Sequence, residues 1–85
     1  EMQIRYQGRH YELTRHKIEN VMQGVVPEIG RRYFIEVNHT QYPIKQVFAV
    51  ALGIPVASFP TGYAFNVLQR LGFIVIDAQG GDRHE

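Results

Sequence analysis

The chain contains no cysteine among its 85 residues. Without thiols it has no disulfide, no thiolate-bound metal and no cysteine nucleophile, which excludes zinc fingers and cysteine hydrolases. It also has no apolar run of about 18 residues and no signal-peptide pattern at its start, so we expect neither a membrane span nor export. A cytoplasmic protein is therefore the expectation.

Motifs that would indicate catalysis are missing as well. The sequence has no GxGxxG, GxxxxGK, GxSxG or HExxH pattern, so phosphate cradles, serine nucleophile elbows and helix-borne zinc are unsupported. His10 and Glu12 are two residues apart on one predicted strand, but no third ligand converges on them, so we expect no metal site. We therefore expect no enzyme and no cofactor.

The composition is that of an ordinary globular chain. Hydrophobic residues make up 45% and charged residues 20%, which is not the balance of a disordered protein. A chain of this length has room for one core and should bury about 60% of its unfolded surface. We expect a single domain over residues 1–78 and a frayed polar tail over residues 79–85.

Periodicity in the first half predicts three strands and a helix. Polar and apolar residues alternate over residues 2–13 with a turn near Gln7-Gly8, which is typical of a hairpin. Thr14 is suited to cap a helix that carries Ile18, Val21, Met22 and Val25 on one face and stops before Pro27. Alternation resumes in a strand over residues 31–38, followed by a polar turn over residues 38–41.

The second half has clear helix boundaries. Pro43 suits the first position of a helix, Gly53 suits its left-handed end, and Thr61 suits the cap of the next helix. Gly72 ends that helix, and residues 73–76 indicate a strand buried on both faces. The expected inward residues are Ile44, Val47, Phe48, Ala51, Ala64, Val67, Leu68 and Leu71, with Lys45, Gln46 and Ala49 off this stripe.

These elements predict an α+β fold. The order is ββαβααβ, with helices packed on a small, mostly antiparallel sheet. The connection between the two late helices is about eight residues long, which disfavours a helix-turn-helix, because that motif has a turn of about three or four residues.

The charge is nearly balanced at +1, so binding to a polyanion depends on where the cations cluster. Basic residues and histidines crowd two segments: Arg5, Arg9, His10, Arg15, His16 and Lys17 in the first, and Arg31, Arg32, His39 and Lys45 in the second. A solvated surface explains any one of them. The alternative is a phosphate site, because a helix start beside cations suits an anion. The predicted nucleic-acid-binding residues are Arg31, Arg32, Tyr42, Lys45, Thr61, Arg15 and Lys17.

Three segments of the second half resemble motifs of a known family. YPIKQV, FPTG and VLQRLGF stand at residues 42–47, 59–62 and 67–73. They resemble the pattern YPPKxV, F-x-G-G or F-T, and VLxRLGF of small reader domains. Such domains occur alone in actinobacterial-type genomes, and more loosely similar ones are the heads of HNH-type modification-dependent restriction endonucleases. The likeness to the standalone proteins is closer and extends back over PEIGRRYFIEV.

The resemblance and the two predicted helix starts indicate that Tyr42, Lys45 and the loop over residues 59–62 form one recognition surface. Tyr42 would stack on a base or press against a sugar, and the alternative is a half-buried tyrosine. Two positions depart from the pattern. Ile44 replaces a second proline, and Pro60-Thr61-Gly62 replaces a small glycine-rich turn. Glycine lets a backbone approach a ligand closely, so the loss of glycines from this turn affects how close the turn comes to a ligand.

The sequence thus predicts a module that binds duplex DNA without catalysis of its own. The resemblance implies the finer role of a reader of modified DNA in a restriction-associated bacterial setting. The alternative is a protein–protein adaptor or regulatory domain, whose partner is another protein or a longer parent chain. Such an adaptor would use Phe34, Tyr63 and Phe65 if these aromatic residues are exposed.

Overall fold

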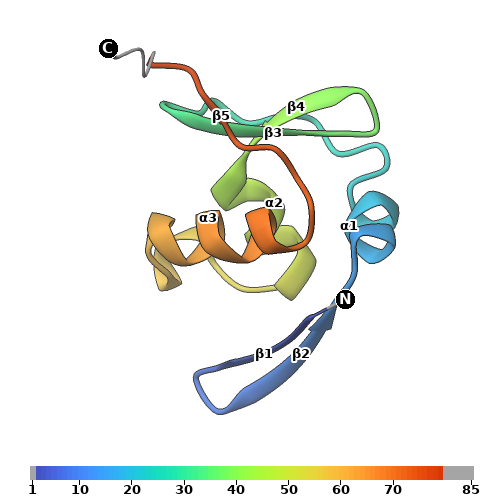
Figure 1. Ribbon diagram of the computed structural model, residues 1–85, viewed down its shortest axis with the longest axis vertical. Helices are drawn as coiled ribbons and strands as arrows, with labels where there is room; N and C mark the ends of the chain where they lie inside the picture. The colour runs from blue at the N-terminus through green and yellow to red at the C-terminus, as the bar shows by residue number, and fades with distance from the viewer. Residues whose placement is uncertain (1, 80–85) are drawn as a thin grey trace.

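The computed structural model describes residues 2–79 of the chain. A two-stranded hairpin lies at one end of the 39 Å long axis, a three-stranded sheet lies toward the other, and helices occupy the space between them (Figure 1). The predicted α+β class is confirmed. The order ββαββααβ contains one strand more than predicted, and the strands form two antiparallel sheets.

The hairpin consists of β1 (Met2–Tyr6) and β2 (Arg9–Leu13), paired antiparallel with Met2 opposite Leu13. Both turn residues, Gln7 and Gly8, have positive φ, at 53° and 79°. A two-residue turn of this kind matches the twist of the strands that it joins. The predicted hairpin and its turn are confirmed.

The first helix, α1 (Arg15–Val21), begins as predicted, because the Thr14 side chain accepts a hydrogen bond of 2.9 Å from the Lys17 amide. It ends at Val21, well before Pro27. Val25, which the periodicity places on the helix, lies in the loop that follows it. Ile18 and Met22 are buried in the core, as predicted.

The second sheet has the order β4-β3-β5 and is antiparallel throughout. Its central strand is β3 (Tyr33–Val37), and β4 (Thr40–Pro43) pairs along it. The predicted turn after β3 is present but shorter than residues 38–41. The turn needs only Asn38 and His39, with φ of 54° and 67°, so the chain is already extended at Thr40.

The last strand, β5 (Ile76–Asp77), pairs with β3 over two residues only. The prediction of a strand buried on both faces over residues 73–76 was wrong. Ile74 is 82% exposed, because the described part of the chain provides no layer over that side of the segment. Phe73 alone in this segment is buried in the core.

The two late helices are α2 (Ile44–Leu52) and α3 (Thr61–Arg70), and the 3₁₀ turn η1 (Val56–Ser58) lies between them. Each starts one residue away from its prediction. Pro43 is extended, with ψ of 139°, and therefore precedes α2 instead of occupying its first position. Pro60 occupies the cap of α3, so Thr61 is the first helical residue and its side chain makes no capping bond.

Both helices end as predicted. Gly53 has the left-handed φ of 71° after α2. At the end of α3, the Phe73 amide donates to the Leu68 carbonyl at 3.1 Å and the Gly72 amide donates to the Gln69 carbonyl at 3.0 Å. These two bonds form a Schellman motif, which returns Phe73 to the core.

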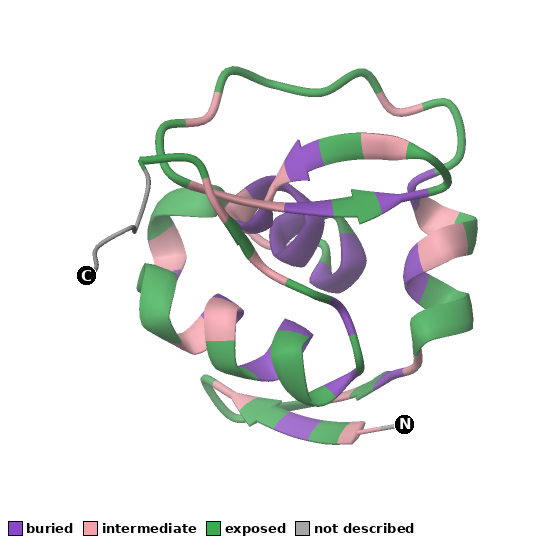
Figure 2. Ribbon diagram, turned by 45° about the horizontal axis from the view of Figure 1, so that its top comes forward, coloured by how far each residue is buried: buried purple, intermediate pink, exposed green. Residues whose placement is uncertain are grey.

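The α2 helix is the centre of the molecule and is buried on nearly every side (Figure 2). The predicted inward residues of α2 and α3 are all buried. Gln46 and Ala49, predicted to lie off the apolar stripe, are buried as well, because elements pack around α2 and leave it almost no solvent face. Gln46 is the only buried polar side chain among residues 2–79.

The hairpin is joined to the helices by aromatic contacts. The Tyr6 ring stacks on Tyr63 of α3 with 5.5 Å between centroids, and its hydroxyl donates to the Ser58 carbonyl. Of the predicted tail, only Gln79 lies within the described residues, and its amide donates to the Asp77 carboxylate at 3.0 Å. Within the described range, no helix has the length and apolar character needed to cross a membrane.

Candidate functional site

Four of the predicted binding residues line one groove of about 630 Å³. The residues are Arg31, Arg32, Lys45 and Thr61, and we call this hollow the basic groove. Its walls are the loop before β3, the start of α2 and the start of α3. Segments distant in sequence therefore meet at one concave surface.

A glutamine holds the loop wall of the basic groove in place. Gln46 is 5% exposed, and its Oε1 accepts a hydrogen bond of 2.9 Å from the Glu28 amide. Its Nε2 donates to the Val26 carbonyl, also at 2.9 Å. Both ends of the side-chain amide are therefore used to attach the loop to α2, as a buried polar group requires.

Close backbone packing fixes the same loop at a second point. A Cβ on Gly30 would lie 2.7 Å from Pro43 Cγ and 2.9 Å from Phe34 Cε2, which is closer than atoms can approach without a shift. Only glycine allows the loop to pass this near to the end of β4.

Lys45 lies in the first turn of α2 and extends over an aromatic ring. Its Nζ is 5.1 Å from the ring centroid of Phe59, which is itself buried against Phe48 with centroids 4.7 Å apart. A cation over an aromatic face is attracted by the ring quadrupole. The packed ring therefore limits the positions that the ammonium group adopts in the groove.

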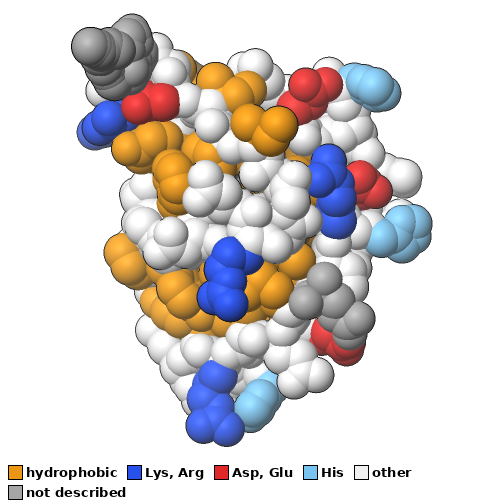
Figure 3. All heavy atoms as spheres, viewed as in Figure 1, with side chains coloured by type: hydrophobic (Ala, Val, Ile, Leu, Met, Phe, Trp, Pro, Cys, Tyr) orange, Lys and Arg blue, Asp and Glu red, His pale blue; other side chains and the backbone are white. Residues whose placement is uncertain are grey.

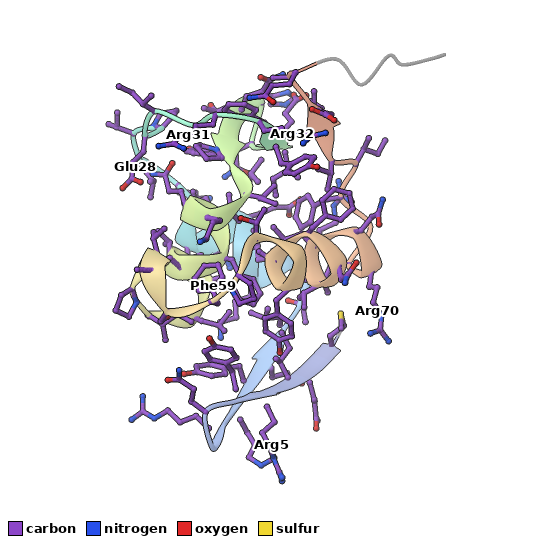
Figure 4. The ribbon with its side chains drawn as sticks, turned by 90° about the vertical axis from the view of Figure 1, so that its left-hand side faces the viewer. Arg5, Glu28, Arg31, Arg32, Phe59 and Arg70 are labelled. Carbon is purple, nitrogen blue, oxygen red and sulfur yellow. The ribbon has the colours of Figure 1, made fainter. Side chains whose placement is uncertain are left out.

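The adjacent arginines have different environments. Arg32 makes two hydrogen bonds of 3.1 Å to the Asp77 carboxylate and lies 4.9 Å from the Tyr33 ring centroid. The hydrogen bond and the charge of Asp77 raise the pKa of Arg32 further above its ordinary value. Figure 4 shows Arg32 turned toward β5, whereas Arg31 and Glu28 lie on the loop beside the start of α2.

Within residues 2–79, neither Arg31 nor Lys45 forms an ion pair. Glu28 is the one carboxylate in the lining of the groove, against three cations. Since Asp77 pairs with Arg32, the unpaired cations of the groove are Arg31 and Lys45. The groove is therefore cationic while the whole chain is nearly neutral.

A protein-family model described as SCO5918-like matches residues 4–84. The chain belongs to the SCO5918-like family. The match covers nearly the whole chain, including the hairpin, and is longer than the segments that carry the resemblance to reader domains. The searches of curated proteins and of solved structures return no match.

In this SCO5918-like domain, Tyr42 does not belong to the groove surface. It is 3% exposed, and its hydroxyl donates to the Val25 carbonyl at 2.8 Å and to the Met22 carbonyl at 3.3 Å. The predicted stacking on a base or sugar needs an open ring face, which this burial removes. Tyr42 instead attaches the start of the loop to the sheet.

The other two predicted residues of the SCO5918-like domain also lie outside the basic groove. Arg15 donates to the Gly72 carbonyl at 2.7 Å, and its guanidinium is 4.5 Å from the Phe73 ring centroid. It therefore joins α1 to the C-terminal end of α3, where the helix dipole favours a cation. Lys17 donates to the Glu12 carbonyl at 3.3 Å and joins α1 to β2.

Lys and Arg side chains do not form a continuous patch on the face shown in Figure 3. Lys and Arg side chains on that face are separated by apolar and uncharged surface. Arg5 lies on the hairpin and Arg70 at the end of α3, both away from the groove (Figure 4). Arg5 and Arg70 therefore do not add to the charge of the basic groove.

A second groove of about 630 Å³ has mixed charge. Its lining includes Arg15, Glu19, Glu36, His39 and the exposed Ile74. Among the described residues, no three His, Asp or Glu side chains are grouped as a metal ion would require.

The aromatic surface that an adaptor would use is not open in this SCO5918-like domain. Phe34, Tyr63 and Phe65 are each only partly exposed. Tyr63 packs on Tyr6, and Phe65 packs edge-on against Tyr33 with 5.2 Å between centroids. Their rings are therefore mainly part of the fold.

Sequence reasoning missed two features of the groove. It placed Gln46 off the core stripe, and periodicity alone does not reveal a buried glutamine. It also overlooked Ile29, which is fully exposed in the lining. The exposure of Ile29 could have been expected from Pro27 and Gly30 on either side of it. Such residues indicate a loop, and an apolar residue in a loop does not belong to the buried face of a helix or strand.

Proposed function

We propose that this domain binds duplex DNA through the basic groove and has no catalytic activity of its own. The observation that carries the proposal is that Arg31 and Lys45, from different elements, line one groove without an ion pair among the described residues. Cations placed in this way neutralise phosphates, and phosphate contacts supply most of the affinity in non-specific DNA binding.

The helix starts at the groove support the same ligand. Lys45 is in the first turn of α2, and Thr61 is the first residue of α3. The first amide groups of a helix have no partner within the helix and attract anions. In its finer form, which rests on the resemblance to reader domains, the proposal is that the groove distinguishes modified from unmodified duplexes.

Charge reversal tests the proposal directly. Fluorescence anisotropy would measure binding of labelled duplexes, plain and modified, from low to high salt. For the double variant Arg31→Glu/Lys45→Glu, we expect weaker binding and a log–log salt slope reduced by about 2, because about one unit is lost per phosphate contact.

The matched control is Arg5→Glu/Arg70→Glu, which changes the net charge by the same amount at two sites away from the groove. It should leave the slope closer to that of the wild type. If both double variants bind alike, binding depends on net charge and not on the groove. If the wild type does not bind any duplex at low salt, the proposal fails.

A protein–protein interaction domain is the second candidate. It is favoured by the exposed Ile74 and Ile76 beside the second groove, because β5 is an edge strand in the described sheet. Edge strands with apolar neighbours accept strands from partners. Absence of DNA binding by the wild type would make this candidate the leading one.

A further inference from the structure

The loop between α1 and β3 exposes two large apolar side chains beside the basic groove. Ile29 is 100% exposed and Val26 is 79% exposed. Figure 2 shows this loop as almost entirely exposed, in contrast to the buried α2 beneath it. Ile29 also belongs to the lining of the basic groove. Its side chain is therefore available to whatever occupies that groove.

Contacts on both sides of Ile29 hold its side chain in an exposed position. Gln46 bonds to the backbone of Val26 and of Glu28, and the packing of Gly30 against Pro43 holds the other side of Ile29. Pro27 further restricts the backbone between these anchors. Because the residues on both sides are fixed, the loop does not turn inward to bury the isoleucine.

The groove combines this isoleucine with cations. Arg31 follows Ile29 by two residues, and Lys45 lines the same groove from α2. Many proteins bind DNA by placing cations on phosphates and inserting an apolar side chain, isoleucine among them, between base pairs. An anionic membrane also attracts apolar and basic residues, but it favours a broad apolar face. The two exposed apolar side chains here, Val26 and Ile29, do not make a broad face, and of the two only Ile29 lines the concave groove, which suits a duplex better.

We propose that Ile29 inserts between stacked base pairs of a duplex held in the basic groove, and that the duplex is unstacked and bent at that step. This inference rests on the proposed function. The Gln46 contacts and the Gly30 packing hold Ile29 outward, so its insertion requires no rearrangement of the loop.

Unstacking of the bases can be measured directly. A duplex of about 20 base pairs with 2-aminopurine at its centre and a fluorophore at each end reports unstacking and bending separately. With the whole chain at low salt, we expect 2-aminopurine fluorescence to rise and the end-to-end distance to shorten. For Ile29→Ala, both signals should be lost, and affinity should fall by about ten-fold or more, the value of burying an isoleucine side chain.

The matched control is Ile74→Ala, which removes another isoleucine side chain, 82% exposed, outside the basic groove. It should retain both signals. If the wild type binds without unstacking, or if Ile29→Ala behaves as the wild type, insertion is refuted while the proposed function stands. If no duplex is bound, both proposals fail. Binding only to vesicles of phosphatidylserine and phosphatidylcholine, with loss in Ile29→Ala, would identify a membrane surface instead.

Discussion

Replacement of Gln46 by alanine tests how the loop wall of the basic groove is held. The variant loses two hydrogen bonds, one donated by the Glu28 amide to Gln46 and one donated by Gln46 to the Val26 carbonyl. A neutral hydrogen bond contributes about 0.5–1.5 kcal/mol net, so the loss is about 1–3 kcal/mol. Because Val26 and Glu28 are exposed, water replaces the lost partners, and we expect the lower part, about 1–2 kcal/mol.

Thermal unfolding followed by circular dichroism would measure this loss. In a domain of this size, 1 kcal/mol shifts Tm by about 4–8 °C, so we expect Gln46→Ala to lower Tm by about 4–16 °C. Gln46→Leu keeps the apolar volume and lacks both bonds, which separates lost hydrogen bonding from lost packing. Gln69→Ala is the matched control, because Gln69 is an exposed glutamine on α3.

Hydrogen exchange gives a second, local measurement. The Glu28 amide should exchange slowly in the wild type and fast in Gln46→Ala, while amides in the core of α3 remain protected. The reasoning would be refuted by a wild-type Glu28 amide that exchanges as fast as an open loop. A Tm loss for Gln46→Ala no larger than that for Gln69→Ala would refute it as well.

Three further predictions concern the fold. Leu68→Ala removes a fully buried side chain and should cost about 2–5 kcal/mol in urea unfolding, and a loss below about 1 kcal/mol would contradict its place in the core. Gly30→Ala should cost about 1–3 kcal/mol because its Cβ would meet Pro43 at 2.7 Å, whereas Gly62→Ala, which meets nothing within 4 Å, should be neutral or stabilising in the same unfolding assay. Burial raises the pKa of the Tyr63 hydroxyl, so the fold favours the protonated form and stability should decline as pH rises above about 10. Tyr63→Phe should make that decline shallower in unfolding measured across alkaline pH, and an unchanged slope would show that Tyr63 does not contribute.

Features that depend on local backbone chemistry were predictable from the sequence. The Gln7-Gly8 turn, the Thr14 cap and the helix ends at Gly53 and Gly72 all lie where it placed them. Each of these features is decided by the φ preference or the hydrogen-bonding groups of one or two residues. The inward stripes of α2 and α3 were predictable for a similar reason, since apolar residues at helical spacing must share a face.

The candidate site was predictable only in part. The sequence placed Lys45 and Thr61 at two helix starts and Arg31 at the first position of a strand, and these residues meet in the basic groove, where Arg31 lies in the loop before β3. It did not distinguish Arg31 from Arg32, because the carboxylate that pairs with Arg32 is 45 residues further along the chain.

Which polar and aromatic residues are buried depends on tertiary packing. Gln46 and Tyr42 carry polar groups that often lie at a surface, yet both are enclosed, because the loop after α1 packs against them. Ile29 and Ile74 are of a residue type that usually lies in the core, yet both side chains are exposed. Burial depends on which elements come to lie against a residue, and in this domain those elements are supplied by distant parts of the chain.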